Sequence, residues 1–418
     1  CGGGGQNVAA FSHTGALEWR TTATITTRYY SVAIGDLQGD GSPEIVAGGS
    51  VFSSSGTFLW SQPELSGILG GLATNAPSLQ DVDGDGLMEV IASNAVFNHD
   101  GSVLWRGGSV ANGYTAVARV IDSSVMRGPQ VVAVNQTTFQ ILDGATGTSM
   151  FGPVVYEASG ILAGPPTVAD FDGDGHPEIG VAGDDRYVVF DPDMAVSPFI
   201  RWFVPSEDSS TGSVGSTVFD FDADGSAEVI YADECHVRIL SGVDGSVVWY
   251  ASNSSATALE FPVVADVDAD GNAELIVVSN SPSSSCAGRS LPFDGETRGV
   301  RVFRDRLDNW VPTRSIWNQH TYHLDNVRDD GSLPLTEAPS WSTHNTYRLN
   351  PLLDPDAVTQ APDLRIVAHG ALVGSCPVTA TLRARVENRG SRGVPAGVRV
   401  AFFAGDPPDR SMLLGVGV

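Results

Sequence analysis

Short apolar segments alternate with acidic, glycine-containing loops through the first 300 residues, and the same order of segments returns every 41–50 residues. In each unit, a short apolar strand enters an acidic loop and a strand rich in β-branched residues leaves it. Two further strands follow, as at 95–97 and 103–105, joined by a tight turn at Asp100–Gly101. Asp-Gly and Ser-Gly turns between alternating apolar runs are typical of β-hairpins. Each unit therefore predicts four antiparallel strands.

The repeated unit indicates the fold class. Units of about 45 residues with four antiparallel strands are typical of propeller blades, which bury their faces only against neighbouring blades and so close a ring. The absence of a 3.6-residue apolar period excludes a helical solenoid. We therefore predict an all-β fold over residues 1–350. The predicted architecture is a seven-bladed β-propeller, and six or eight blades are the alternatives. The loops begin at Asp36, Asp81, Asp170, Asp220 and Asp266, with a sixth, degenerate copy at Asp122.

The ends of this region predict how the ring closes. Residues 1–19 match only the outer two strands of a blade, so the chain starts halfway through a unit. The sixth blade is expected to end with strands at 300–303 and 309–312. Residues 321–335 resemble a worn inner strand, loop and second strand. Joined to residues 1–20, this segment would complete a seventh blade from both termini.

The C-terminal region is predicted to be a separate unit. Residues 351–361 have the composition of a linker, and residues 362–418 follow with alternating strands at 363–367, 378–387 and 398–403. This pattern indicates an immunoglobulin-like β-sandwich. Only 57 residues remain for it, whereas such a sandwich needs about 100. We expect the domain to be incomplete, or to be completed by a partner strand.

The loop pattern D-x-D-x-D-G-x-x-E has the chemistry of a calcium site. Carboxylates at loop positions 1, 3 and 5 converge because the chain curls, and Gly at position 6 permits the positive φ that the curl requires. A backbone carbonyl at position 7 and Glu at position 9 complete an all-oxygen shell suited to Ca²⁺. A solvated acidic turn is the alternative for any single loop. The predicted ligands are Asp36, Gln38, Asp40, Ser42, Glu44; Asp81, Asp83, Asp85, Leu87, Glu89; Asp170, Asp172, Asp174, His176, Glu178; Asp220, Asp222, Asp224, Ser226, Glu228; and Asp266, Asp268, Asp270, Asn272, Glu274.

We expect about five calcium ions with a structural role, because each cage is filled by groups close in sequence. The first loop has Gln38 at position 3 and is expected to bind more weakly. The degenerate loop at Asp122 is predicted to be empty, because Met126, Arg127 and Gln130 replace a ligand, the glycine and the closing Glu.

Charge excludes some classes of partner. The chain has 49 Asp and Glu against 23 cations, all of them Arg, and a formal charge of −26. Residues 1–288 carry −27 and residues 289–418 carry +1. Nucleic acid is excluded as a partner, since binding to phosphates depends on clustered cations. An anionic membrane surface is disfavoured for the same reason. No apolar run of about 18 residues predicts a membrane span.

The cysteines leave two alternatives open. Their spacing contains no C-x-x-C, which disfavours a zinc or redox motif. Cys235 and Cys286 lie in neighbouring repeats and either form a disulfide or remain two buried thiols. Cys1, followed by four glycines, resembles the start of a bacterial lipoprotein, but the next residues already have the pattern of a blade strand. No signal peptide is present, so we expect a mature, trimmed or partial chain.

The repeats resemble the FG-GAP/VCBS class of calcium-binding propeller repeats, related in pattern to the integrin α-subunit head, over residues 1–350. Residues 309–323 look like the closing segment of bacterial members, and residues 362–418 look like the opening of a CARDB-type adhesion domain. Integrins usually have Asp at loop position 9, where this chain has Glu. The resemblance implies an extracellular protein of the cell surface that acts in adhesion or glycan binding.

Three functions follow in order of preference. The first is an adhesion or assembly module of a bacterial surface protein, which binds protein on a cell surface or matrix. The second is lectin-like glycan binding through exposed aromatics, although Trp60, Trp105 and Trp249 are better explained by core packing. The third is a polysaccharide lyase. No G-x-S-x-G, H-E-x-x-H or P-loop motif is present, so we do not expect an enzyme. The cluster of His320 and His323 is better explained by packing where the ring closes than by catalysis.

Overall fold

The computed structural model describes most of the chain. The described residues are 7–22, 25, 31–66, 68–69, 72–73, 77–111, 113–121, 128–135, 137–156, 163–183, 185–195, 197–208, 214–257, 260–281, 286, 291–306, 308–353, 364–375, 379–388, 400–403 and 413–417. They form an all-β protein, and the helical part is limited to the short 3-10 helices η1 (Pro63–Ser66) and η2 (Leu324–Asn326) and to α1 (Ser340–Thr343). None of the described helices is long and apolar enough to cross a membrane.

Six antiparallel sheets follow one another along residues 32–303, and in each sheet the strands pair in sequence order. The first three consist of β3 (Val32–Gly35), β4 (Glu44–Ala47), β5 (Ser50–Phe52), β6 (Phe58–Ser61); β9 (Ser78–Gln80), β10 (Glu89–Ala92), β11 (Ala95–Phe97), β12 (Val103–Arg106); and β13 (Tyr114–Ala118), β14 (Gln130–Val134), β15 (Thr138–Asp143), β16 (Ser149–Val155). The next three consist of β17 (Thr167–Ala169), β18 (Glu178–Ala182), β19 (Arg186–Phe190), β20 (Ile200–Pro205); β21 (Thr217–Phe219), β22 (Glu228–Ala232), β23 (His236–Leu240), β24 (Val247–Ser252); and β25 (Val263–Ala265), β26 (Glu274–Ser279), β27 (Gly299–Phe303).

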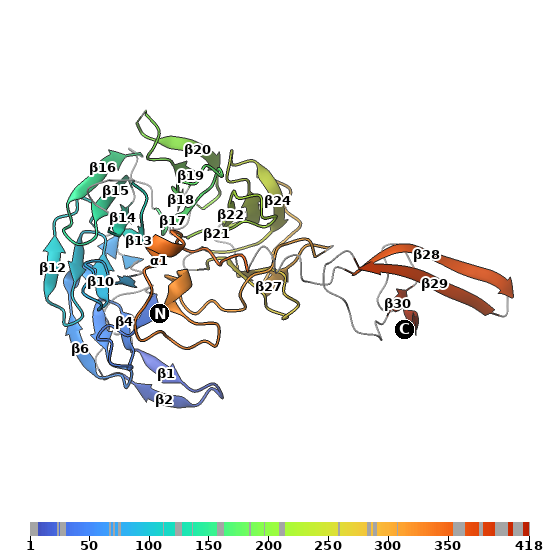
Figure 1. The fold of residues 1–418 in the computed structure, drawn as a ribbon, viewed down its shortest axis with the longest axis horizontal. Coiled ribbons are helices and arrows are strands. Elements are labelled where there is room, and N and C mark those ends of the chain that lie inside the picture. Colours follow the sequence, from blue (N-terminus) through green and yellow to red (C-terminus); the bar gives the residue numbers. More distant parts are fainter. Residues whose placement is uncertain are drawn as a thin grey trace.

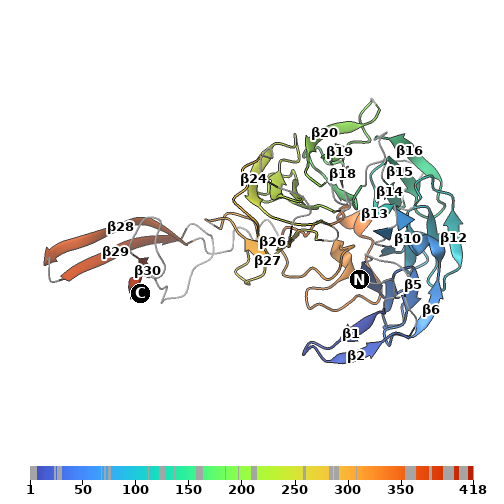
Figure 2. The ribbon, with the colours of Figure 1, turned by 180° about the vertical axis from the view of Figure 1, so that it is seen from behind.

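The first strands of these sheets lie side by side around a common centre, as Figures 1 and 2 show from opposite sides. β3 contacts β9, β9 contacts β13, and the series continues through β17 and β21 to β25. The inner strands are buried, whereas the outer strands alternate: all residues of β14 are buried, but β16 is mostly exposed. Each sheet therefore buries both faces near the centre and one face at the rim.

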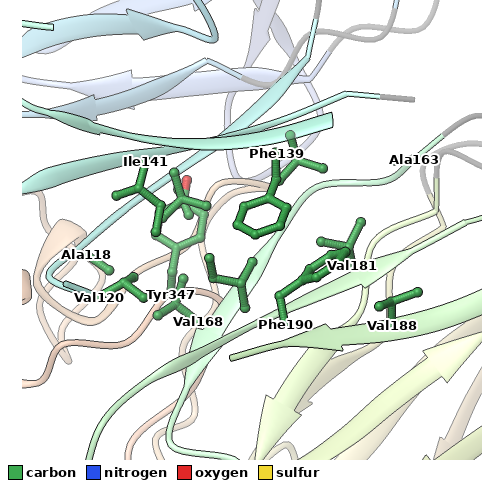
Figure 3. Packing of buried hydrophobic residues seen from close by; sticks show 14 of the residues in the cluster. Ala118, Val120, Phe139, Ile141, Ala163, Val168, Val181, Val188, Phe190 and Tyr347 are labelled. Atoms are coloured by element: carbon green, nitrogen blue, oxygen red, sulfur yellow. The ribbon is translucent and has the colours of Figure 1, made fainter. Parts of the chain in front are cut away.

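The core lies between neighbouring sheets. Figure 3 shows the largest cluster, in which Phe139 and Ile141 of the third sheet pack against Val181 and Phe190 of the fourth. The rings of Phe139 and Phe190 lie 4.5 Å apart. Burial of one such side chain contributes about 1.5–3 kcal/mol. Tyr347, from far along the chain, enters the same cluster.

A tryptophan on the outer strand of one sheet packs on a turn glycine of the next. Trp60 of β6 lies over Gly101, where a Cβ would stand 2.7 Å from the indole, and its Nε1–H donates to the carbonyl of His99 (3.0 Å). Because Gly101 also has φ +83°, only glycine suits both the turn and the contact. Trp60 and Trp105 were expected to pack within the fold rather than to bind a glycan, and both indoles lie against a turn of the next sheet. The same contact occurs at Trp19 over Gly56, Trp105 over Gly147 and Trp202 over Gly245.

The N-terminal hairpin stands in the same relation to the first sheet. Among the described residues, β1 (Ala9–Phe11) pairs only with β2 (Leu17–Arg20), and Trp19 of β2 lies over Gly56 in the β5–β6 turn. The hairpin thus occupies the place of an outer strand pair that precedes the first sheet. A second small hairpin, β7 (Ile68–Leu69) with β8 (Leu72–Ala73), lies between the first and second sheets in sequence.

Residues 313–352 run through the centre and link the last sheet to the first. The carbonyl of Arg314 accepts a hydrogen bond from the N–H of Asp266, directly after β25 (3.1 Å). The side chain of Gln319 accepts one from the N–H of Ile34 in β3 (2.7 Å). Further along, Tyr347 and Leu349 form isolated bridges with β17 and β21. In Figure 1 this segment fills the middle of the array of sheets.

Two segments expected to be strands have other structures. Residues 321–335 contain η2 and a turn at 328–332 instead of a strand. The Arg314 guanidinium donates to the carbonyls of Leu324 (2.9 Å) and Val327 (2.7 Å). In a strand, these carbonyls would accept hydrogen bonds from a neighbouring strand. Residues 309–312 pair instead with the acidic loops of the fifth and sixth sheets, where the N–H of Val311 donates to the carbonyl of Phe221 (3.1 Å) and its carbonyl accepts from the N–H of Ala273 (3.1 Å). The sixth sheet therefore has three strands among the described residues.

The structure joins Cys235 and Cys286 in a disulfide that closes a loop across 51 residues. Both residues are buried beside the outer half of the fifth sheet. Constraining a loop of this length in the unfolded chain contributes about 2–4 kcal/mol to stability. Cys1 lies outside the described residues, so the lipoprotein prediction falls there too.

The C-terminal region forms two hairpins. β28 (Leu364–Ser375) pairs with β29 (Thr379–Asn388), and β30 (Val400–Phe403) pairs with β31 (Leu413–Gly417). Three of these strands overlap the predicted segments, whereas β31 was not predicted. Within the described residues, no ladder joins the two hairpins to each other or to the six sheets. Most of the predicted linker, residues 354–361, lies outside the described residues.

Candidate metal centres

The acidic loops connect the first and second strands of their sheets and share one internal structure. In the second loop, Asp81 at position 1 accepts hydrogen bonds from the N–H groups of Gly84 (2.7 Å) and Gly86 (3.0 Å). Asp85 at position 5 accepts one from Leu87 (2.8 Å). These bonds wrap the backbone around the first carboxylate, so that the side chains at positions 1, 3 and 5 face one region.

The curl requires left-handed backbone at position 4 as well as at position 6. Gly84 has φ +84° and Gly86 has φ +91°, while Ala223 and Ala269 hold position 4 of the last two loops at +57° and +62°. Sequence reasoning identified only position 6. The small residue at position 4, Gly or Ala in all five copies, was the available signal.

Glu at position 9 begins the second strand of its sheet and is buried in four of the five loops, whereas Glu228 is half-buried. One carboxylate oxygen accepts a hydrogen bond from the N–H of position 2, at 2.7–3.0 Å in all five loops. This bond closes the loop across its base. The pairs are Leu37 with Glu44, Val82 with Glu89, Phe171 with Glu178, Phe221 with Glu228, and Val267 with Glu274.

Four of the predicted loops bring three carboxylates together, with ligand oxygens within 4.8 Å of one another, and these groups could hold a metal ion. In the second loop the group contains positions 1, 3 and 5, and in the others it contains positions 1, 3 and 9. The groups are Asp81, Asp83, Asp85; Asp170, Asp172, Glu178; Asp220, Asp222, Glu228; and Asp266, Asp268, Glu274.

Burial raises the pKa of each position-9 carboxyl, and the neighbouring Asp residues raise it further. The pKa of Glu89 and of Glu178 rises to about 8, and that of Glu228 and of Glu274 rises to about 7. The pKa of Glu44 is also raised, mainly by burial. A bound cation would reverse this effect, because it favours the charged form of every carboxyl in the loop.

Two buried carboxylate oxygens provide a test of whether the loops fit a cation. Glu89 is 1% exposed and Glu274 is 2% exposed. In each, the second oxygen has no hydrogen-bond partner. A buried polar atom without a partner costs about 1–3 kcal/mol. Glu274 belongs to the same compact carboxylate group as Asp266 and Asp268, so an ion bound there would supply the missing partner. The donor set is entirely oxygen, as Ca²⁺ prefers.

The first loop differs from these four. Asp36, Asp40 and Glu44 are all described, but they are absent from the compact carboxylate groups. The amide nitrogen of Gln38 lies 3.4 Å from Glu44 and donates to it. Gln38 thus gives this carboxylate a partner from within the loop, and the weaker binding expected of the first loop stays a prediction.

The degenerate loop lies outside the described residues at 122–127, including Asp122, Met126 and Arg127. Its position-9 residue, Gln130, is described. The amide oxygen accepts from the N–H groups of Val120 (2.9 Å) and Ile121 (2.8 Å), and the amide nitrogen donates to the carbonyl of Ile121 (2.7 Å). Gln130 brings no charge to this position, and the emptiness of the loop stays a prediction because residues 122–127 lie outside the described part of the chain.

Sequence reasoning missed a cation beside the third loop, which begins at Asp170. Arg201 of β20 forms ion pairs with Asp172 and with Asp191 (3.2 Å for the latter). Arg201 is far from the loop in sequence, and no local pattern indicates the contact. A bound metal would compete with this guanidinium for Asp172, so we expect weaker binding here than at the second loop.

One further cluster lies away from the loops. Glu207, Asp233 and His236 place their ligand atoms within 4.8 Å of one another. Asp233 also forms an ion pair with Arg238 (2.5 Å), and Nε2 of His236 lies 3.1 Å from the carbonyl of Pro292. Arg238 therefore already compensates a carboxylate of this cluster, in contrast to the loops.

The raised pKa values predict how pH affects the loops. In the metal-free chain, the folded pKa of Glu89 and Glu178 lies above the usual 4.5, so the stability that these carboxyls contribute is fully present below about pH 4.5 and lost as pH rises through about 8. Calcium competes with the bound protons. The calcium-dependent increase in Tm should therefore widen between about pH 5.5 and about pH 8.5, measured by calorimetry with dialysed protein. An equal increase at both pH values would contradict this assignment.

The chain matches no protein-family model and no curated protein. Among solved structures, it is similar to the V. cholerae biofilm matrix protein Bap1, with a TM-score of 0.64 and 19% identity over 82% of this chain and 80% of that chain. It is also similar to rhamnogalacturonan lyase YesW (TM-score 0.42, 18% identity, 64% of this chain, 48% of the lyase) and to the Bacillus licheniformis lyase PL11 (TM-score 0.44, 18% identity, 66% of this chain, 50% of the lyase). The likeness to Bap1 shows a shared fold.

Proposed function

We propose that residues 7–353 form a calcium-stabilised β-propeller of the FG-GAP/VCBS type, and that it serves as an extracellular module for adhesion or assembly. The observation that carries the proposal is the recurrence of one carboxylate cage at the same place in four sheets. Calcium is the ion of choice because the ligands are all oxygen, and because Mg²⁺ retains its waters and seldom receives such protein-rich cages. With the first loop, about five ions are expected.

Two observations favour seven blades. Six sheets succeed one another around the centre, and the β1–β2 hairpin has the position of an outer strand pair before the first sheet. Residues 313–319 hydrogen-bond to both the last and the first sheet, where an inner strand of the same blade would run. In this proposal the seventh blade has an irregular inner half and a regular outer half.

The adhesive role is supported by the fold and by the rim. Bap1, which has the same fold, is a biofilm matrix protein. Large apolar side chains are also exposed on the outer strands of several sheets, where they are available to a partner. They include Phe11 (60% exposed), Val155 (64%), Phe203 (56%), Val248 (62%) and Val300 (69%). The C-terminal hairpins, CARDB-like by resemblance, would extend this surface.

Glycan binding is the second candidate, because a cavity beside the second acidic loop is lined by Trp341 together with Asp81, Asp83 and Glu337, and an aromatic side chain with a few polar neighbours is typical of a small-ligand site. A protein ligand and a glycan ligand are both compatible with a module that holds cells or matrix together.

Adhesion is tested with beads coated with the whole chain and applied to the extracellular matrix of the source organism. In about 1 mM calcium, in the range of extracellular calcium sites, we expect coated beads to be retained several-fold better than albumin-coated beads. Protein dialysed free of metal should lose this retention. Retention at the albumin level in calcium would contradict the adhesive role.

A further inference from the structure

Neighbouring acidic loops are joined by backbone hydrogen bonds that start from loop position 8. In the fourth loop, which begins at Asp220, the N–H of Ala227 donates to the carbonyl of Asp170 in the third loop (2.9 Å). In the second loop, the N–H of Met88 donates to the carbonyl of Leu37 in the first (3.3 Å). A loop is therefore attached to the loop of the neighbouring sheet as well as to its own strands.

The fourth and fifth loops are joined through one residue that follows the sixth sheet. The N–H of Ala273, at position 8 of the fifth loop, donates to the carbonyl of Val311 (3.1 Å). The N–H of Val311 in turn donates to the carbonyl of Phe221 at position 2 of the fourth loop (3.1 Å). Ala273 is 1% exposed and Val311 is 4% exposed, so water competes little for these bonds.

Position 8 also determines where this series of hydrogen bonds is interrupted. Proline occupies the position in the first loop, in the degenerate loop and in the third loop, as Pro43, Pro129 and Pro177. Proline has no N–H, so none of these three loops can donate from position 8 to the loop before it. The bonds therefore divide the five loops into a pair, the first and second, and a group of three, the third, fourth and fifth.

Each bond between loops connects groups that are predicted to bind the ions. The N–H of Ala227 belongs to the same peptide group as the carbonyl of Ser226, the predicted ligand at position 7 of the fourth loop. The carbonyl of Asp170 belongs to the same peptide group as the N–H of Phe171, which donates to the carboxylate of Glu178 (2.7 Å). One chain of hydrogen bonds thus runs from a ligand of the fourth loop to a ligand of the third.

Neighbouring loops also touch at positions 4 and 7. A Cβ at Gly173, position 4 of the third loop, would lie 3.0 Å from Oγ of Ser226 in the fourth. A Cβ at Gly39 of the first loop would lie 3.6 Å from the side chain of Leu87 at position 7 of the second. The curl of one loop therefore forms part of the surface on which the next loop rests.

The curl of one loop should support the curl of the next. A loop that binds an ion gathers several carboxylates, and their mutual repulsion opposes this arrangement. A neighbour that already holds its curl provides a fixed hydrogen-bond partner, so the second loop loses less conformational freedom on binding, which gives positive coupling. Hydrogen bonds in a chain also polarise one another, so an ion at the carbonyl of Ser226 should strengthen the bond from Ala227 to Asp170.

Charge acts in the opposite direction. A filled loop is less negative, so it attracts an ion to its neighbour less strongly. Salt screens this effect, with a Debye length of about 8 Å at physiological ionic strength. The charge effect depends on the distance between loops and not on the residue at position 8. A proline substitution at that position therefore separates it from the coupling through hydrogen bonds.

We propose that the calcium sites of this chain form two cooperative groups, the first loop with the second, and the third with the fourth and fifth. The inference rests on the proposed calcium-stabilised propeller and adds how its sites are regulated. Binding within one group is mutually dependent, whereas the two groups bind independently. Hydrogen bonds from position 8 couple the loops of a group, and proline at position 8 separates the groups.

The test measures calcium binding at each loop separately, by hydrogen–deuterium exchange with mass spectrometry on the whole chain during a calcium titration. Peptides that contain one loop each give one calcium midpoint per loop. Asp222→Asn removes a charged ligand from the fourth loop. It should raise the midpoint of the third loop about fivefold or more, the usual lower size of coupling between sites. The midpoint of the second loop should change less than about twofold.

Two matched variants at Ala227 test whether the hydrogen bond is responsible. Ala227→Pro removes the N–H, and Pro43 and Pro177 at the same position of other loops indicate that the fold accepts it. In this background, Asp222→Asn should change the third-loop midpoint less than about twofold. Ala227→Ser keeps the N–H and should keep the fivefold effect. Ala273→Pro gives the corresponding test for the fourth and fifth loops, with Asp268→Asn as the variant that weakens the fifth.

Three results would overturn the proposal. One is a third-loop midpoint that Asp222→Asn leaves unchanged. The others are equal shifts in the second and third loops, or a shift that persists in Ala227→Pro, since the hydrogen bond would then not couple the sites. If calcium protects every loop but the midpoints are independent, the calcium-stabilised propeller stands without cooperativity. If calcium protects no loop, both the proposed calcium sites and this inference are rejected.

Discussion

Removal of calcium is expected to lower the Tm of the chain by roughly 8–15 °C relative to about 10 mM calcium. A site with a Kd of about 0.1–1 mM, the range of extracellular modules, stabilises the folded state by about 1.4–2.7 kcal/mol at that concentration. Four such sites contribute about 6–11 kcal/mol. For a unit of about 350 residues, 1 kcal/mol corresponds to about 1.4 °C. Calorimetry of dialysed protein with and without calcium measures the difference.

Glu89→Gln is the matched variant for this experiment. At pH 7 the metal-free Glu89 is mostly protonated, because its pKa is about 8, and Gln has nearly the shape of the protonated acid. The variant keeps an acceptor for the N–H of Val82. We therefore expect an unchanged Tm without metal, and a calcium-dependent gain smaller by about 1.4–2.7 kcal/mol. If the parent chain has the same Tm with and without calcium, the metal has no structural role.

Replacement of Arg348 by Ala is expected to lower the free energy of unfolding by about 3–5 kcal/mol in saturating calcium. Arg348 is 1% exposed at the centre, and burial lowers its pKa to about 10, so it stays charged at neutral pH. Its guanidinium donates to the carbonyls of Ser216 (2.8 Å) and His320. It also lies over the rings of Phe261 and Trp317. Truncation leaves both carbonyls without a donor and opens a cavity between them.

Two further variants make the Arg348 result specific. Arg348→Lys keeps the positive charge but loses the planar guanidinium, so it should recover only part of the lost free energy of unfolding. Arg328→Ala removes an exposed arginine of the same central segment and should change stability by less than about 0.5 kcal/mol. Urea unfolding gives all three values. If Arg348→Ala and Arg328→Ala have equal stability, the central arginine does not hold the sheets together.

The parts of the fold that sequence predicted are local. Each acidic loop is determined within nine residues, so positions such as Asp81 and Glu89 could be assigned from spacing alone, and the structure gathers the Asp residues of that loop. The hairpin turns could be predicted for the same reason, since Asp100–Gly101 lies between two adjacent strands. In these elements, the residues that interact are also neighbours along the chain.

The parts that sequence did not predict depend on contacts between distant residues. Residues 321–335 have an apolar pattern compatible with a strand, but the guanidinium of Arg314 takes their carbonyls. The hydroxyl of Tyr347 lies 2.8 Å from that of Ser78, across 269 positions. No local pattern encodes such a pair. The contact between Gln80 and Ser340 was missed for the same reason, because the two residues meet only in the folded chain.

The order in which the chain is made gives the central segment a further consequence. All six sheets precede residue 304, whereas the residues that bind both the last sheet and the first lie at 314–319, and the buried Arg348 comes later still. A growing polypeptide thus completes its repeats before it possesses the segment that joins the two ends of the array. Until residue 348 has been synthesised, the sheets can stack on their neighbours, but the central segment does not yet hold the last sheet and the first together.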